Sequence, residues 1–452
     1  MGSFKIGKGL DLKLAGAPQT EVTSAPRPQR VGIHPTEFRG VKPKLLCKEG
    51  ETVKCGQSLF FDKRNPDVHF AAPAGGRIES VNYGPRRIIE SIVIKPDWDA
   101  ADVQFGTRSK SDISKMSREE ALKLLLDSGA FVSFRQRPFD KIPDPSRAPK
   151  SIFITAMNSA PNAGDPAFML KERGEELQLG IHLLTKLTDG KVHLCYDPQR
   201  DVETFAGLEG AQHHSFAGKH PKGLVGTHIH FVDPIKKGDI VWYLDAWHVY
   251  AIGWLLQRGT CCTEKVIALA ASGVAQPRYI KTMVGAPLKP IIADSLKQGE
   301  MRLIAGTALF GETKSEDDYL PFYESNLQAI PEGRRRHFMG WAMPGFNAYS
   351  ASSNVFASSL APGKVWNFDT NLNGGHRTIV WTDVYDQVMP LDIYTNFLVK
   401  AILADEVDET EQLGLLEVSD EDFALATYLC PSKVDISAII RRGLDVIEKE
   451  GY

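Results

Sequence analysis

Cysteine is scarce in this chain of 452 residues, and the few cysteines are scattered. Of the six, only Cys261 and Cys262 are adjacent, and no pairing pattern of the kind that staples small secreted domains is visible. Adjacent cysteines have poor geometry for sharing a metal ion and would strain a disulfide, so we expect this pair to pack in the core. The pattern favours a reducing, cytoplasmic environment.

An excess of charge of one sign is also absent. With histidine neutral the formal net charge is −3, from 53 basic and 56 acidic residues. Such a balance gives no electrostatic reason to expect nucleic acid as a partner.

Long apolar runs are missing as well. The most apolar long window, residues 240–259, is interrupted by Asp245 and His248, whereas a membrane-spanning helix needs about 18 or more uncharged apolar residues. We expect a buried or amphipathic helix there. The N-terminus carries early lysines without the apolar stretch of a signal peptide. The sequence therefore predicts a chain that does not cross a membrane by itself.

The short motifs of common catalytic and nucleotide sites do not occur. The segment after the first predicted strand of the α/β region reads NSAPNAGDP and contains no G-x-G-x-x-G, so the ordinary dinucleotide fingerprint is missing. G-x-S-x-G, Walker A and H-E-x-x-H patterns are absent too.

Residues 1–100 consist of short apolar runs punctuated by glycine and proline, which predicts a compact all-β domain. The piece FAAPAGGRIESV resembles the barrel-sandwich family that carries lipoyl and biotinyl groups. The nearest basic pair, Lys63 and Arg64, lacks the residues that flank a lipoyl lysine. A purely structural barrel is therefore favoured over a swinging arm.

Residues 101–259 alternate helical with strand patterns. SREEALKLLLDSG predicts a helix with Ser117 as N-cap and Gly129 as C-terminal stop. KSIFITAM and KVHLCYD predict buried strands, and residues 166–190 between them predict one long helix. This βαβ pattern predicts a Rossmann-like α/β domain with a mainly parallel sheet.

Three further regions complete the chain. Residues 260–335 return to strand patterns with glycine-containing turns and predict a small β-rich module. Residues 336–385 predict a β-rich connecting segment around the polar turn DTNLNGGHRT, and residues 386–452 predict a C-terminal helical domain.

Five of the twelve histidines lie between residues 213 and 230. His228 and His230 are two residues apart, so on a strand both would point to one face and could share a metal ion. A third ligand at a fixed distance and a general base are not evident. We favour a histidine-rich turn and strand with structural hydrogen bonds, with a metal site as the alternative.

The segment DEDFALATYLCP, residues 420–431, ends as the ligand run of ferredoxin-type proteins does, C-x2-C-x2-C-x3-C-P. Counting back from Cys430 by that spacing reaches Ala426, Phe423 and Asp420. One thiolate stands where four are needed, so no four-iron cluster can be held. We expect Cys430 to be a small buried core residue.

The chain resembles the A-subunit family of the Na+-translocating NADH:quinone reductase, a bacterial respiratory complex. The segments that carry the resemblance occur in the family's order and cover nearly all of the chain: KGLDLKLAGAP, FAAPAGGRIESVNYGPRRIIESIVI, DSGAFVSFRQRPFDKIPDP, FITAMNSAP, HPKGLVGTHIHFVDP, HFMGWAMPGFNAYS, VMPLDI and DEDFALATYLCP. The family is similar to the C subunit of the Rnf ferredoxin-oxidising complex and to the flavin-bearing NADH-oxidising subunit of respiratory complex I. The resemblance implies a barrel-sandwich-like β domain, a Rossmann-like α/β domain, a small β-grasp-like module of the SLBB type and a C-terminal helical domain.

The resemblance also implies where the flavin-bearing relatives hold their cofactor. Their glycine-rich loop, which approaches a flavin phosphate, corresponds here to residues 129–141, where Phe131, Phe134 and arginines fill the space. Their carboxylates after the first strand correspond here to Asn158 and Ala160. We therefore expect this chain to bind no cofactor, while NADH, flavins, iron-sulfur clusters and quinone are bound on or with other subunits.

Two functions follow. In the first, the chain is a peripheral, cofactor-free subunit of the sodium-pumping reductase at the cytoplasmic face of the bacterial inner membrane, inactive alone. Its partners are the other subunits, including a membrane subunit, and it contributes to the quinone-reduction end. The alternative is a flavin- or dinucleotide-binding oxidoreductase with an unusual site.

Residues 131–141 are the candidate contact region. They interleave aromatic and basic side chains: Phe131, Phe134, Arg135, Arg137, Phe139 and Lys141. Rings can pack a quinone, and basic donors can bond its carbonyls as negative charge develops. The alternative is contact with a membrane subunit or anionic headgroups. Because three cations are costly to bury and three rings are costly to expose, we expect the segment at an interface rather than inside the α/β domain.

Overall fold

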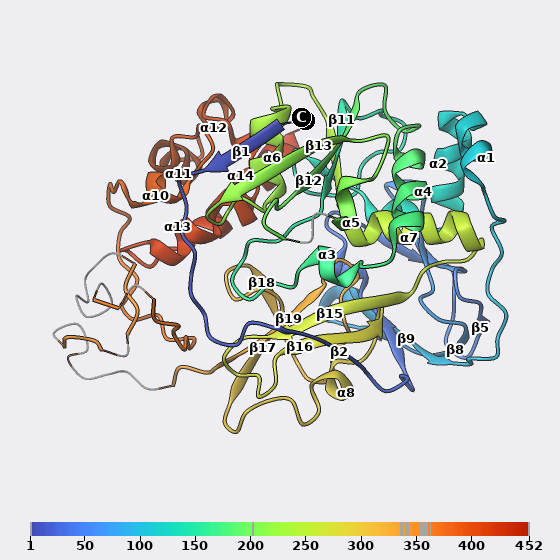
Figure 1. Ribbon diagram of the computed structural model, residues 1–452, viewed down its shortest axis with the longest axis horizontal. Coiled ribbons are helices and arrows are strands. Elements are labelled where there is room, and N and C mark those ends of the chain that lie inside the picture. Colours follow the sequence, from blue (N-terminus) through green and yellow to red (C-terminus); the bar gives the residue numbers. More distant parts are fainter. Residues whose placement is uncertain are drawn as a thin grey trace.

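The computed structural model describes residues 2–200, 203–334, 339, 343–346, 348–351, 360–361 and 363–450. Within these residues, three units built on β-sheets and one helical unit pack together (Figure 1). The predicted multidomain α/β and β fold class is confirmed.

Two small antiparallel sheets form the N-terminal barrel-sandwich unit, with strand orders β3-β9-β8-β5 and β4-β6-β7. Their bounds are β3 Val31–Ile33, β4 Pro43–Leu45, β5 Thr52–Val53, β6 Ser58–Asp62, β7 Asn65–Ala71, β8 Gly76–Tyr83 and β9 Ile89–Pro96. Phe60 and Phe70 stack in the core with ring centroids 4.3 Å apart. Lys63 and Arg64 are exposed in the turn between β6 and β7.

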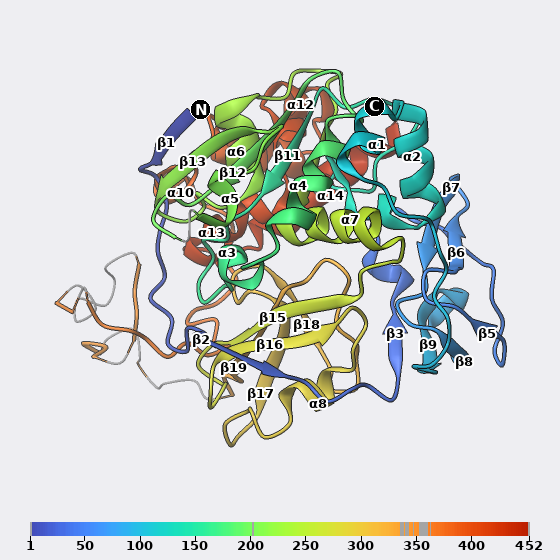
Figure 2. The same ribbon diagram turned by 45° about the vertical axis from the view of Figure 1, so that its right-hand side comes forward.

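The first residues of the chain lie outside this barrel, unlike the predicted boundary. β1 (Gly2–Ile6) runs parallel to β13 in the α/β sheet, and β2 (Gln19–Ser24) runs parallel to β16 in the third sheet. Figure 2 shows this N-terminal stretch passing across both units. An edge strand is added to each sheet through backbone hydrogen bonds, which carry little sequence signature.

The α/β unit holds a six-stranded sheet of order β1-β13-β12-β11-β14-β10. All its pairings are parallel except that of β10 with β14. The bounds are β10 Arg135–Arg137, β11 Ser151–Thr155, β12 Lys191–Tyr196, β13 Gln212–Gly218 and β14 Val241–Asp245. Across the sheet the parallel strands lie in the order β13-β12-β11-β14, which is third, second, first, fourth in chain order, as in a Rossmann half. The topological switch point therefore lies between β11 and β14.

Seven α-helices lie in the described parts of residues 101–259: α1 Lys110–Lys115, α2 Arg118–Asp127, α3 Pro166–Met169, α4 Gly174–Leu184, α5 Glu203–Ala206, α6 Val225–Val232 and α7 Ala246–Arg258. The predicted long helix over residues 166–190 is two helices, α3 and α4. Glu172 between them has φ of 67°, a left-handed conformation that an α-helix cannot pass through. The expected buried helix in residues 240–259 is α7, preceded by the strand β14.

α4 and α7 approach closely because glycines line their contact. A Cβ on Gly253 of α7 would lie 1.7 Å from the backbone oxygen of Glu176 in α4, and one on Gly180 would lie 2.3 Å from that of Val249. Both helices can therefore cover the same face of the sheet with their backbones almost touching.

The third sheet has the order β18-β17-β19-β15-β16-β2 and is mixed. Its bounds are β15 Glu264–Ala270, β16 Arg278–Met283, β17 Met301–Gly306, β18 Gly311–Lys314 and β19 Asn326–Pro331, with α8 at Leu288–Ile292. The predicted β-rich module is confirmed.

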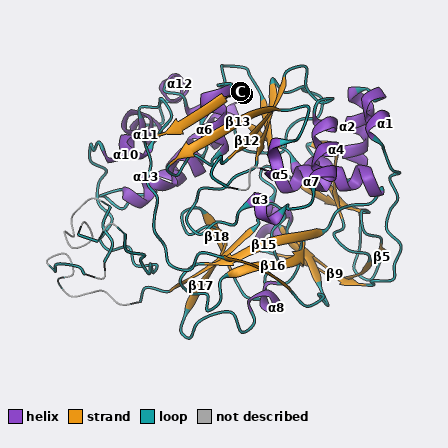
Figure 3. Ribbon diagram, viewed as in Figure 1, coloured by secondary structure: helices purple, strands orange, loops and turns teal. Residues whose placement is uncertain are grey.

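The C-terminal unit is helical, as predicted, with α10 Val384–Val388, α11 Thr395–Leu403, α12 Val407–Gln412, α13 Ala424–Leu429 and α14 Ile436–Glu450. Two short 3-10 turns, η5 Leu415–Glu417 and η6 Asp420–Phe423, precede α13. Figure 3 distinguishes this helical unit from the sheets. None of the described helices is both long and apolar enough to traverse a lipid bilayer.

The connecting segment before this unit differs from the prediction where it can be followed. Residues 363–383, predicted to be β-rich, form no strand and make one isolated bridge, Trp366 with Leu14. Most of the remainder of the predicted segment, residues 336–362, lies outside the described residues.

Gly253→Ala should destabilise the chain by about 1–3 kcal/mol, because the new methyl group overlaps Glu176 and must force α4 and α7 apart. This loss outweighs the helix propensity of alanine, about 1 kcal/mol better than glycine. Urea unfolding followed by circular dichroism measures the change. Gly174→Ala at the start of α4 is the matched control, since no atom lies within 4 Å of its Cβ position. Equal stability of the two variants would contradict the close approach.

Candidate functional site

The carboxyl ends of β11 and β14 mark the place where a doubly wound sheet binds nucleotides. A small cavity of about 10 Å³, about the space of one water molecule, lies beside this place, at the carboxyl ends of β11 and the neighbouring strand β12. Its lining is Ala156, Met157, Asn158, Asp165, Ala167, Tyr196, Asp197, Arg200 and Phe205. The side-chain oxygen of Asn158 accepts a hydrogen bond from the backbone of Ala160 at 2.9 Å. This hydrogen bond holds the loop that contains Asn158.

Titratable side chains lie near the end of β14 at this switch point, and the sequence did not predict them as a site. Asp245 at the end of β14 caps α7 and pairs with His248 Nδ1 at 2.8 Å. Lys265 of β15 is fully buried, donates to the backbone oxygen of Phe322 at 2.6 Å and lies 4.4 Å from the ring centroid of Trp247. Burial lowers the pKa of Lys265 to about 8. Only the fold brings these groups together, since they come from different units.

The loop that was predicted to correspond to the glycine-rich flavin loop packs against the barrel. Gly129 has φ of 71°, and a Cβ there would lie 2.9 Å from that of Ala71 in β7. Phe131 and Phe134 after it are fully buried against Trp242, with ring centroids 5.5 and 5.4 Å away. The rings fill the interior next to β14.

The prediction that residues 131–141 lie at an interface rather than in the interior was wrong for most of the segment. Of the six predicted contact residues, Phe131, Phe134, Arg137 and Phe139 are at most 4% exposed, and only Arg135 and Lys141 are partly exposed. Burial of these cations costs free energy, as the prediction assumed, but ion pairs within the chain offset that cost.

Each cation of the segment has a partner. Arg137 pairs with Asp422 at 3.1 Å, with both side chains 1% exposed. Arg135 lies 3.8 Å from Asp140 and stacks between the rings of Tyr243 and Tyr323, each 4.9 Å away. Lys141 pairs with Glu448 of α14. Two of these partners belong to the C-terminal unit, so the segment ties that unit to the α/β unit.

The positions of the incomplete cysteine motif take part in the same network. Asp420, where a ferredoxin-type protein would place a cysteine, lies 3.2 Å from Arg39 of the barrel unit and 3.8 Å from Arg441 of α14. Asp422 also accepts from the backbone of Ser419 at 2.8 Å. We call the set Arg39, Arg135, Arg137, Asp140, Asp420, Asp422 and Arg441 the arginine-aspartate junction. It joins the barrel, the α/β unit and the helical unit.

Cys430 is fully buried, and the prediction that it is a small core residue is confirmed. Its sulfur lies 3.1 Å from the hydroxyl of Tyr385 and 3.3 Å from the backbone nitrogen of Val434. Phe423 and Ala426 are buried in the same apolar cluster.

His228 and His230 lie on the helix α6, so their predicted placement on a strand was wrong. Two positions along a helix differ by about 200°, and the two rings point apart. His228 is fully buried, lies 2.9 Å from the backbone oxygen of Lys222 and has a pKa lowered to about 3 by burial. Across the described residues no three histidine, cysteine, aspartate or glutamate side chains gather as a metal site would require.

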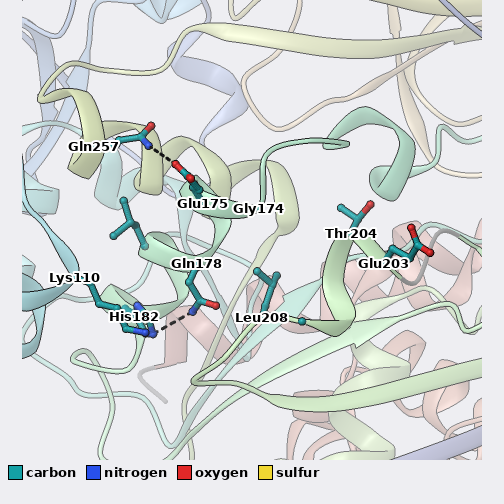
Figure 4. A pocket seen from close by; sticks show the side chains of 11 residues that line it. Lys110, Gly174, Glu175, Gln178, His182, Glu203, Thr204, Leu208 and Gln257 are labelled. Carbon is teal, nitrogen blue, oxygen red and sulfur yellow. Dashed lines mark hydrogen bonds between the residues drawn. The ribbon is translucent and has the colours of Figure 1, made fainter.

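A larger groove of about 560 Å³ lies elsewhere, between α4, α5 and α7 (Figure 4). It is lined by Lys110, Gly174, Glu175, Gln178, Leu179, His182, Glu203, Thr204, Gly207, Leu208 and Gln257. Gln257 donates to Glu175 at 3.3 Å, and Gln178 lies 3.1 Å from His182. The volume suits a small ligand, but none of the predicted contact residues lines it. Its residues come from separate elements, so no motif pointed to it.

Three family models match consecutive parts of the chain. They are the NqrA N-terminal barrel-sandwich hybrid domain over residues 4–97, the NqrA second alpha/beta domain over residues 116–261 and the NQRA C-terminal domain over residues 266–316.

Curated relatives match over almost the whole length. The A subunit of the Na(+)-translocating NADH-quinone reductase of Yersinia pseudotuberculosis serotype I (strain IP32953) is 39% identical over 99% of this chain and 100% of the relative. That of Photorhabdus laumondii is 40% identical with the same coverage, and that of Histophilus somni is 38% identical over 99% of both chains. Among solved structures, an air-oxidized NAD+-reducing [NiFe]-hydrogenase aligns with TM-score 0.36 and 11% identity over 78% of this chain and 72% of that chain, a likeness too low to support an argument.

Arg137→Ala should destabilise the chain by about 3–5 kcal/mol, because it leaves the Asp422 carboxylate buried without its partner. Replacing both partners, in Arg137→Met with Asp422→Leu, should recover most of that loss, since no lone charge remains. Urea unfolding compares these variants. Lys123→Ala, which breaks an exposed pair with Asp127, is the control and should cost less than about 0.5 kcal/mol. A loss for Arg137→Ala no greater than the control's would show that the pair is not a buried one.

Proposed function

The chain belongs to the NqrA family, that of the A subunit of the Na(+)-translocating NADH-quinone reductase, and on this premise we propose that it is a peripheral, cofactor-free subunit that works at the quinone-reduction end of the complex. The observation that carries the assignment is identity of 39–40% over 99% of the chain. The chain is thus one subunit of a multi-subunit oxidoreductase that pumps sodium ions.

The cofactor-free part of the proposal is supported by how the chain's own residues use the relevant places. Asn158 binds its own loop, Gly129 and the phenylalanines after it pack against the barrel and β14, and Asp420 binds arginines. In this arrangement the electrons from NADH travel through flavins and iron-sulfur clusters of other subunits.

The proposed location is the cytoplasmic face of the bacterial inner membrane, next to a membrane subunit. All six cysteines are free thiols, which suits a reducing compartment. NADH is produced and consumed in the cytoplasm, so the entry side of an NADH-quinone reductase faces it. Sodium translocation needs a path through lipid and is assigned to partner subunits.

The quinone or partner contact of residues 131–141 remains a proposal, now centred on the two residues with exposed surface. Arg135 and Lys141 are partly exposed, and the guanidinium of Arg135 is already stacked between two tyrosine rings. A cation held in this way is preorganised to stabilise negative charge on a quinone oxygen. The buried residues of the segment hold these two cations in position: Phe131, Phe134, Arg137 and Phe139.

The isolated chain should bind none of FMN, FAD and NADH near micromolar concentration, which corresponds to about 8 kcal/mol. Isothermal calorimetry measures this binding, and the affinity-tagged chain should co-purify with the other reductase subunits from a bacterial membrane extract. Saturable micromolar binding of a flavin or dinucleotide would instead support the alternative oxidoreductase. A chain that purifies alone from an extract with active reductase would overturn its assignment to the complex.

Arg135→Gln combined with Lys141→Gln should lower the kcat of the assembled complex for quinone reduction about tenfold, because stabilisation of the charge that develops on the quinone oxygens is lost. Electron entry from NADH into partner-held flavin should keep its rate, since this chain acts after that step. Stopped-flow flavin reduction and steady-state quinone reduction separate the two. Lys44→Gln, an exposed lysine of the barrel unit, is the control. Unchanged quinone kinetics in an assembled complex would refute the contact.

A further inference from the structure

The helix α11 is apolar on two opposite sides. Its inner side packs Leu398, Val399 and Ile402 into the core of the C-terminal unit, each at most 3% exposed. On its outer side Phe397 and Leu403 are 48% and 43% exposed, and Tyr394 at its N-cap is 67% exposed. A helix at a protein surface ordinarily turns a polar side outward, whereas one that is apolar all round is covered on both sides.

Neighbouring side chains extend this surface. Trp381, 55% exposed, meets the ring of Phe397 edge to face with centroids 4.9 Å apart. Lys400 lies over Trp381 with its ammonium 4.9 Å from the ring centroid. Val380 beside them is 50% exposed. We call the set Val380, Trp381, Tyr394, Phe397, Lys400 and Leu403 the α11 patch.

The residue types of the α11 patch are those of a binding surface. Tryptophan and tyrosine are enriched among the residues that dominate the energy of protein interfaces, because they bury a large area with few rotatable bonds. Three aromatic rings gathered on one outward surface also exceed the scattered apolar residues of an ordinary monomer. Figure 1 places α10, α11 and α12 together at one edge of the molecule, where a partner can reach them.

The surrounding charge identifies the partner's chemistry. Residues 381–412 contain eight carboxylates and one lysine, Lys400, whose ammonium is engaged with Trp381. Four of the carboxylates are exposed directly after the end of α11: Asp405, which pairs with Arg442, and Glu406, Asp408 and Glu409. A bilayer with anionic headgroups would be repelled by this acidic border. A second copy of the chain would place the same carboxylates against each other across a two-fold axis.

We propose that the α11 patch is the docking site for a basic amphipathic helix of another protein chain. The apolar side of that helix packs on Trp381, Tyr394 and Phe397, with anchors spaced three and four residues apart. Its lysines and arginines face the acidic border that begins at Asp405. The inference rests on the proposed function only for the identity of the partner, which is then another subunit of the reductase.

Photo-cross-linking from position 397 tests the docking site in living cells. A benzophenone amino acid replaces Phe397 in the full-length chain, and the cross-linked peptide is identified by mass spectrometry. We expect a cross-link to one protein chain within a segment rich in lysine and arginine with apolar residues at helical spacing. The same amino acid at Tyr83, an aromatic residue of the barrel unit that is 56% exposed, is the control and should not reach that segment.

The outcomes separate the docking site from the proposed function. A basic amphipathic segment of a reductase subunit supports both, and such a segment of an unrelated chain keeps the site but overturns the assignment to the reductase. Cross-links only to lipid, only to a second copy of this chain, only to an acidic or non-helical segment, or to nothing overturn the docking site. If the tagged chain still co-purifies with the reductase in that case, the assignment to the reductase stands without it.

Truncation of the patch gives an independent measurement. Trp381→Ala with Phe397→Ala should weaken the affinity for the partner identified by cross-linking about thirtyfold, as expected when central aromatic anchors are lost. Because both side chains are about half exposed, the isolated variant should unfold at the same temperature as the parent chain. Adding Asp408→Asn and Glu409→Gln should weaken binding further and reduce its salt dependence. Tyr83→Ala is the control, and full retention by the double variant would overturn the proposal.

Discussion

The ion pair between Arg137 and Asp422 is the contact on which the arrangement of the units depends. The two residues are 285 positions apart, and both side chains are excluded from water. A lone buried charge costs several kcal/mol, so neither partner can be withdrawn without the other. The pair therefore acts less as a source of net stability than as a constraint that allows one docking of the C-terminal helical unit on the α/β unit.

The arginine-aspartate junction extends this constraint to the barrel. Arg39 comes from the barrel and Arg441 from α14, and both lie near Asp420. Two of the junction's carboxylates, Asp420 and Asp422, belong to the short turn η6, in the segment whose spacing resembles a cysteine ligand run. Acidic residues in that turn hold the units together by charge. Phe423, Ala426 and Cys430, the other positions of the run, fill the apolar core beneath it.

The helical unit turns buried charges toward its neighbours and carries exposed aromatic rings beside its acidic border. Charges on its inner side are satisfied by arginines of the other units, whereas the rings of Trp381, Tyr394 and Phe397 on its outer side have about half of their surface or more exposed. The two features fit a protein whose C-terminal unit stands between its own chain and a partner.

The sequence by itself determined the elements and the family. Apolar spacing and capping residues placed the barrel, the βαβ segments, the third sheet and the C-terminal helices, because those signals act within a few residues. The spacing before Cys430 likewise sufficed to predict a buried thiol.

The tertiary structure alone decided the features that depend on distant partners. Burial of residues 131–141 required Asp422 and Glu448, and the first strands joined two sheets through backbone hydrogen bonds. His228 and His230 sit on a helix because α6 packs against the sheet, a tertiary choice that overrode a local pattern readable as strand. Local propensity is weak where long-range contacts contribute more free energy, so these placements could not be predicted from neighbouring residues.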